Sequence, residues 1–165
     1  MRCLSMLSVI ALVAGFPLPA RSQPAETPVF KSLHDAKLAA MAGLPACFSA
    51  EVQRGDPSKE RAIFLIHGAA NCFVPWHWHG VTEVVMIVNG TLRLQMKEGQ
   101  PVLLRSGGYS SLPEKHVHRG GCVTPCTFFA YSDGPFDIHY VDEAGKEIPA
   151  DEALKTSKPT AVKKR

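Results

Sequence analysis

Short segments rich in β-branched and aromatic residues recur along the chain, and glycine, proline and asparagine separate them. Such spacing is typical of strands in an antiparallel barrel or jelly roll, so we expect an all-β fold of one domain. Asn89-Gly90 is a strong hairpin signal between two of these segments. A short helix is predicted over residues 34–42, where good helix formers gather. The pattern predicts strands at 47–52, 61–67, 83–88, 91–96, 102–105, 127–131 and 136–141, with one more leading into 107–118.

The two ends of the chain differ from its middle. Arg2, an apolar run over 4–16 and the small residues around Arg21 have the order of an export signal, cleaved after Ala20 or Ser22. The run is too short for a permanent membrane span, and no other segment could cross a bilayer. We therefore expect a signal peptide at 1–22, an N-terminal arm at 23–44, a barrel at 45–145 and a basic, disordered tail at 146–165. The mature protein would be periplasmic or secreted.

Net charge excludes one class of partner. The formal charge of +3 comes from the two ends, and residues 23–154 carry a charge of −4. A mildly acidic domain has no basic face for nucleic acid. We expect a small-molecule ligand or substrate instead.

The most informative residues are His77 and His79. Side chains one residue apart point to the same face of a strand, so the two rings can converge on one metal ion. Glu83 follows closely and could add an oxygen ligand, and His118 is the candidate for a fourth position. Such a mixed set suits a divalent transition metal. The alternative is a group of polar residues on an exposed strand, but the apolar surroundings argue for burial, where unpaired polar groups are costly.

These residues resemble the paired motifs of the cupin family. The first motif, G-x5-H-x-H-x3/4-E-x6-G, is met by His77, His79, Glu83 and Gly90, although Asn71 stands where its leading glycine is usual. The second motif, G-x5-P-x-G-x2-H, is met by Gly107, Pro113 and His118, with Lys115 in place of its inner glycine. The resemblance implies a double-stranded β-helix, or jelly-roll barrel, with a metal and ligand held inside its mouth.

The neighbouring residues leave alternatives open. His116 shares strand parity with His118, so it is a second candidate for the fourth ligand or a pocket residue. His139, on the last predicted strand, could also reach the barrel mouth. Trp76 and Trp78 alternate with the histidines and should face away from the metal. Their apolar surface needs a cover, which could be the N-terminal segment or a second subunit in a homodimer. Iron, manganese, zinc, nickel and copper all accept these ligands.

Four cysteines remain after removal of the signal, and an even number permits two disulfides in an oxidising compartment. Cys122 and Cys126 flank a tight turn, so we expect them to be bridged; Cys47 and Cys72 are the remaining pair. A zinc site made by all four cysteines is an alternative that their spacing disfavours. Another is that all four are small buried residues without bonds.

Two functions fit the sequence. The first is a metal-dependent enzyme acting on a small organic molecule, with an oxygenase-type reaction, because the ligand set leaves open metal positions. The second is a non-catalytic module that binds or senses a small ligand or metal outside the cytoplasm. The absence of a further acid–base pair in the motifs keeps the second hypothesis open. No nucleophile elbow, phosphate-binding loop or dinucleotide fingerprint is present.

Overall fold

The computed structural model describes residues 27–155. The expected signal peptide, the start of the arm and the last ten residues of the tail lie outside the described residues. Residues 27–31 belong to a separate unit and have no helix or strand, whereas residues 32–155 form one compact unit. Its elements, in chain order, are η1 (Leu33–Asp35), β1 (Phe48–Arg54), β2 (Ala62–Gly68), β3 (Cys72–Trp78), β4 (Glu83–Asn89), β5 (Thr91–Met96), β6 (Val102–Arg105), β7 (Tyr109–Leu112), β8 (His118–Cys122), β9 (Cys126–Ser132), β10 (His139–Tyr140) and α1 (Ala150–Lys155).

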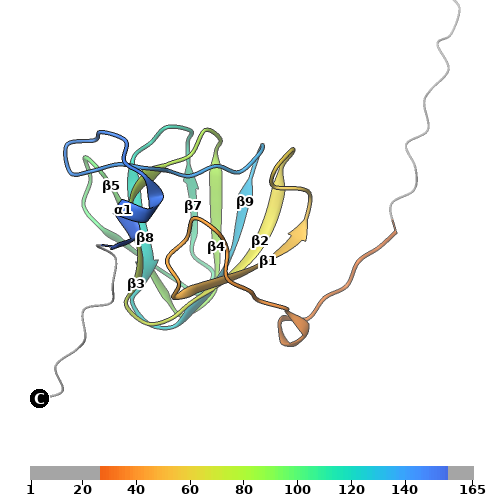
Figure 1. Cartoon of the computed structure of the whole chain (residues 1–165). Helices are drawn as coiled ribbons and strands as arrows, with labels where there is room; N and C mark the ends of the chain where they lie inside the picture. The colour runs from red at the N-terminus through yellow and green to blue at the C-terminus, as the bar shows by residue number, and fades with distance from the viewer. Residues whose placement is uncertain (1–26, 156–165) are drawn as a thin grey trace, which may run out of the picture. The chain divides into compact units, whose positions relative to one another are not determined.

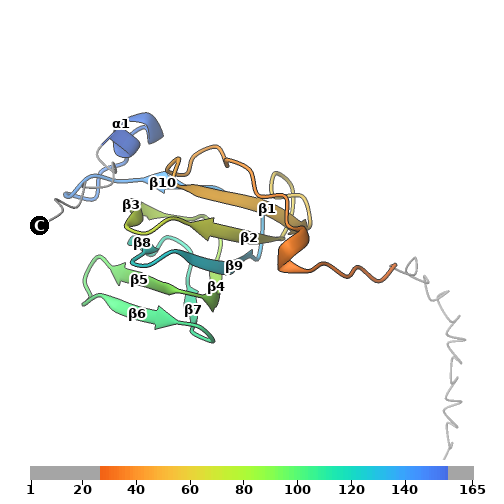
Figure 2. The ribbon, with the colours of Figure 1, turned by 90° about the horizontal axis from the view of Figure 1, so that it is seen from below.

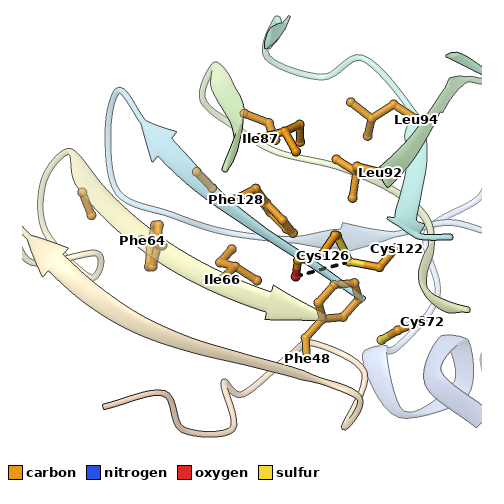
Figure 3. Close-up of a cluster of buried hydrophobic side chains, with 13 residues drawn as sticks. Phe48, Phe64, Ile66, Cys72, Ile87, Leu92, Leu94, Cys122, Cys126 and Phe128 are labelled. Atoms are coloured by element: carbon orange, nitrogen blue, oxygen red, sulfur yellow. Dashed lines mark hydrogen bonds between the residues drawn. A yellow bond between two sulfur atoms is a disulfide. The ribbon is translucent and has the colours of Figure 1, made fainter. Parts of the chain in front are cut away.

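The strands form two five-stranded antiparallel sheets, in the orders β1-β2-β9-β4-β7 and β10-β3-β8-β5-β6 (Figures 1 and 2). The expected all-β, single-barrel fold is therefore confirmed. Apolar side chains from both sheets point toward one another and form the core between them (Figure 3). Phe64, Ile66 and Phe128 come from the first sheet, and Leu92 and Leu94 come from the second.

The strands on either side of Asn89-Gly90 do not form the predicted hairpin. β4 pairs with β9 and β7, whereas β5 pairs with β6 and β8 in the other sheet. Gly90 turns the chain from one sheet to the other with φ of +78°, and a Cβ there would lie 2.1 Å from the Pro125 carbonyl oxygen. The glycine is needed for left-handed backbone and close packing, which are shared by hairpins and by sheet-to-sheet corners.

Two disulfides lie at the end of the barrel where Gly90 turns the chain from one sheet to the other. Cys122 ends β8 in one sheet and Cys126 begins β9 in the other, and the structure contains the bond between them. The second bond joins Cys47, just before β1, to Cys72, which begins β3 in the opposite sheet. Cys72 and Cys122 are also register partners, so the two bonds are adjacent. Both bonds lie where the connections from β2 to β3, from β4 to β5 and from β8 to β9 pass from one sheet to the other, and we call this the disulfide end.

The segments before and after the barrel differ from expectation. The helix predicted over residues 34–42 is wrong, because Ala39 instead exchanges backbone hydrogen bonds with Ala50 of β1 and is held extended. Residues 146–155 are ordered: Glu147 forms a bridge with Val141, and α1 packs against β3 and β10. The folded part therefore extends ten residues past the expected barrel end. Neither helix in the described part combines the length and apolar character that a bilayer crossing requires.

Candidate metal centre

Three strands bring the predicted ligands together inside the barrel. β3 carries His77 and, one residue past its end, His79, while β8 begins with His118, which is the register partner of His77. The three side chains are buried, with exposures of 5%, 4% and 2%. Their ligand atoms lie within 4.8 Å of one another. The period-two argument for His77 and His79 thus holds in the backbone that the sequence adopts.

Backbone carbonyls orient all three imidazoles. The Nδ1–H groups of His77, His79 and His118 donate to the carbonyl oxygens of Pro75, Asp137 and His116, at 2.7, 2.5 and 2.9 Å. A carbonyl only accepts, so Nδ1 carries the proton and Nε2 keeps its lone pair. Nε2 of His79 is buried without a hydrogen-bond partner. Nδ1 held by a carbonyl and Nε2 left free is the arrangement of metal-binding histidines, so the residues fit a metal ion.

Glu83, the first residue of β4, lies beside the three histidines. Its Oε2 lies 3.7 Å from Nε2 of both His79 and His118, and its side chain is 14% exposed. Burial raises the pKa of Glu83, but contact with His118 and the positive charges that His79 and His118 can carry outweigh it and lower the pKa overall. Burial and the nearby His118 and His79 hold the pKa of His77 well below its usual range. A neutral imidazole beside a carboxylate is the form that binds a cation.

A cavity of about 60 Å³ lies under these residues, and we call it the barrel cavity. Its walls are apolar apart from the three histidines and Glu83. Met41 and Leu44, from the segment before β1, line it together with Phe136 and Ile138 from the segment before β10. The hydroxyl of Tyr140 donates to the Gly43 carbonyl at 2.6 Å and attaches the first of these segments to β10.

His116 and His139 do not line the barrel cavity. His116 is exposed and lies in the turn before β8, so strand parity with His118 does not apply to it. His139 pairs with Trp78, and its ring stacks on the indole with centroids 3.9 Å apart on the outer face. The expectation that either residue enters the pocket is therefore corrected.

Trp76 and Trp78 face away from the cavity side of β3, where His77 lies, as strand alternation predicts. Trp76 is 8% exposed; its Nε1–H donates to Glu143, and the Arg119 guanidinium lies 4.3 Å from its ring centroid. The cover of Trp76 therefore includes the chain's own C-terminal segment. The burial of Trp76 does not require a second subunit.

Asp137 is a functional candidate that the sequence did not reveal. Its carbonyl accepts from His79, and its Oδ1 accepts from the Gly80 backbone N–H at 2.7 Å. Its Oδ2 lies 3.2 Å from Nε2 of His139. Asp137 thus fixes the orientation of His79 from a loop more than fifty residues away in sequence. A carbonyl contact of this kind leaves no residue-type signal, since any amino acid can supply it.

Comparison with solved structures identifies the fold. An RmlC-like cupin from Shewanella frigidimarina gives a TM-score of 0.54 at 16% identity, with 66% of this chain and 92% of that chain covered. KdgF from Halomonas sp. gives 0.54 at 14% identity, with coverages of 66% and 94%. The DMSP lyase DddQ from Ruegeria pomeroyi gives 0.54 at 19% identity, with coverages of 67% and 59%.

The chain therefore has the cupin fold, as its paired motifs indicated. No family model and no curated protein matches the sequence. At identities this low, the structural likeness defines the fold and leaves the reaction to be argued from the site.

Proposed function

We propose that this chain is an exported metal-dependent enzyme that carries out an oxygenase-type reaction on a small organic molecule. The observation that carries the proposal is the convergence of three imidazoles and one carboxylate on an apolar cavity. A divalent transition metal held by His77, His79, Glu83 and His118 would supply a Lewis-acidic or redox-active centre with free coordination positions.

The chain's own residues prepare the site for that ion. Carbonyl contacts fix the three rings before any metal arrives, so little ordering remains to be done on binding. Glu83 adds one negative charge beside a cation, and the apolar lining limits the number of water molecules that compete with a substrate.

A non-catalytic binding module is the second candidate, and one observation favours it. Among the described residues that line the barrel cavity, the three histidines and Glu83 are the ones with ionisable side chains. If all four hold the metal, proton transfer to a substrate must come from water or from the substrate itself. A cavity lining without a further acid or base suits a protein that binds a ligand tightly without converting it.

Two disulfides support the exported location, because such bonds persist in oxidising compartments. The proposed signal peptide at 1–22 adds to this reasoning from the sequence alone. We propose a periplasmic or secreted protein.

Metal analysis of protein purified from an oxidising compartment tests the ligand assignment. We expect one divalent metal ion per chain in the wild type and loss of that ion in His77→Ala/His79→Ala. His116→Ala is the matched control, because it removes a histidine that lies outside the cavity, and it should retain the metal. Equal metal content in wild type and the double variant would overturn the assignment.

Turnover assays then separate the two functions. Dioxygen uptake and product formation are measured with the metal-loaded protein on phenolic, keto-acid and thiol compounds. Conversion that is lost in the double variant and kept in His116→Ala supports the enzyme. Tight binding of a compound with no conversion in any assay supports the binding module.

A further inference from the structure

The wall of the barrel cavity has no partner for a charged substrate group. Among the described residues, its lining contains no lysine, arginine, serine, threonine, tyrosine, asparagine or glutamine. The four polar residues present are those that we assign to the metal. A second charged group that does not bind the metal would lose its water in this space and gain no ion pair or hydrogen bond from the wall in return.

Two arginines, Arg93 and Arg119, follow cavity-lining residues in the sequence, but their side chains point away from the cavity. Arg93 lies between the cavity residues Leu92 and Leu94 on β5, so strand alternation places it on the other face. Its guanidinium lies 4.6 Å from the centroid of the Phe73 ring. Arg119 follows His118 and is held outside by Gln95, whose Oε1 accepts from both Nε and Nη2. These cations are thus held away from a bound molecule.

The size of the barrel cavity also limits its occupant. The volume of about 60 Å³ exceeds the roughly 10–15 Å³ that a single water needs, so the cavity has room for a small molecule. Met41 and Ile138 bound the cavity from segments outside the two sheets, and both are partly buried. A short aliphatic chain attached to one metal-binding atom matches this space.

We infer that the ligand of this site is a short, apolar molecule with one metal-binding heteroatom, such as a thiol, and no second charged group. The inference rests on the proposed metal function and narrows its substrate class. It excludes compounds whose carboxylate lies away from the metal and needs a cationic side chain for recognition. Binding energy comes from the bond to the metal and from burial of the hydrocarbon part against the cavity wall.

A pair of matched thiols tests this inference without measuring activity. The protein is loaded with Co²⁺, and 1-propanethiol or 3-mercaptopropionate is titrated anaerobically while the thiolate-to-cobalt absorption is followed. The two probes share a thiol and two methylene groups, and they differ in a methyl against a carboxylate. We expect 1-propanethiol to bind at least tenfold more tightly. Affinities within twofold, or tighter binding of 3-mercaptopropionate, would overturn the inference.

Variants that move a charge provide the internal control. Ile138→Arg places a guanidinium at the boundary of the cavity and should reduce or reverse the preference for 1-propanethiol. Met41→Lys makes the same test from the segment before β1 if Ile138→Arg fails to fold. Arg93→Ala removes a cation from the outer face and should leave the affinity ratio of the wild type unchanged. A ratio that changes in Arg93→Ala as much as in Ile138→Arg counts against recognition inside the cavity.

The Co²⁺ titration distinguishes failure of the metal assignment from failure of the ligand inference. If the wild type takes up no Co²⁺, or if His77→Ala/His79→Ala takes up as much, the metal assignment fails and the ligand inference falls with it. If Co²⁺ binds as expected and 3-mercaptopropionate is preferred, the metal assignment stands and the ligand inference alone is wrong.

Discussion

The two ends of the barrel are stabilised in different ways. At the disulfide end, two covalent bonds tie the sheets together, and Cys72, Cys122 and Cys126 are fully buried. At the other end, which carries the candidate metal centre, the three histidines and Glu83 meet with no bond to join them in the absence of an ion. Covalent links act whether or not a ligand is present, whereas a metal site contributes only when it is filled.

This difference predicts separate responses to metal and to reductant. The histidine end should depend on metal and pH, because it gathers titratable groups in a buried space. The disulfide end should depend on thiol reagents and on little else. Each end can then be perturbed while the other serves as an internal reference.

Metal loading should give the largest effect. With free Ni²⁺ at about a thousand times its dissociation constant, we expect the free energy of unfolding to rise by about 4 kcal/mol. The gain should disappear in His77→Ala/His79→Ala and persist in His116→Ala, whose imidazole is exposed. Chemical denaturation with and without Ni²⁺ measures it. A gain of equal size in the double variant would mean that Ni²⁺ binds elsewhere.

Removal of the disulfides should give the next largest effect, and the two bonds should differ. The Cys47–Cys72 bond closes a loop with a sequence separation of 25, and the Cys122–Cys126 bond one of 4. By chain entropy alone, Cys47→Ala/Cys72→Ala should lower the free energy of unfolding by about 3.5 kcal/mol and Cys122→Ala/Cys126→Ala by about 2 kcal/mol. Denaturation in urea compares the variants, and a larger loss for the shorter loop would contradict the loop-length argument.

Acid should weaken the histidine end of the metal-free protein. Burial, with the nearby His118 and His79, lowers the pKa of His77, so the folded state resists a proton that the unfolded chain accepts below pH 6.5. Stability is therefore fully present above pH 6.5 and falls as the pH decreases, by about 1.4 kcal/mol at one pH unit below that value.

Unfolding curves measured from pH 7.5 to 5.5 test this dependence. His77→Asn should flatten it, whereas Cys122→Ala/Cys126→Ala should shift the whole curve downward without changing its slope. An unchanged slope in His77→Asn would assign the pH dependence to other groups.

Much of the barrel could be predicted, because the information is local. The strands at 91–96 and 102–105 are observed with the predicted bounds, and the alternation of His77 and His79 with the tryptophans follows from strand geometry. What failed depended on distant partners. Asn89-Gly90 has the same backbone requirement in a hairpin as in a corner, and the choice is made by β8 and β9.

The same limit applies to the site. His116 has the right parity but lies before its strand begins, and the bounds of a strand are set by its pairing partners. Asp137 acts on His79 through a carbonyl, which no residue type encodes. The sequence predicts that residues 146–155 belong to a disordered tail. In the structure Ala153 is buried, and α1 packs on β3 and β10.

The two departures from the cupin motifs provide the smallest and most local test of the two ends. Among the described residues, Asn71 and Lys115 are the non-glycine residues with positive φ, at 57° and 60°. They are also the positions where the motifs usually have glycine. The backbone therefore keeps the left-handed conformation that glycine favours, although another residue is present. Asn71 precedes Cys72 at the disulfide end, while Lys115 donates its backbone N–H to the His79 carbonyl at 2.8 Å beside the metal centre.

Replacing Lys115 and Asn71 by glycine should therefore change the free energy of unfolding by different amounts at the two ends. A lysine pays the steric cost of left-handed backbone, roughly 1–2 kcal/mol, and part of the gain on its removal is offset by the greater freedom of glycine in the unfolded chain. We expect Lys115→Gly to raise the free energy of unfolding by roughly 0.5–1 kcal/mol. Asn71→Gly should change it by a few tenths at most, since asparagine tolerates this region. Lys115→Ala keeps the backbone strain and removes the charge, so it should show no comparable gain; a gain equal to that of Lys115→Gly would trace the effect to the charge instead.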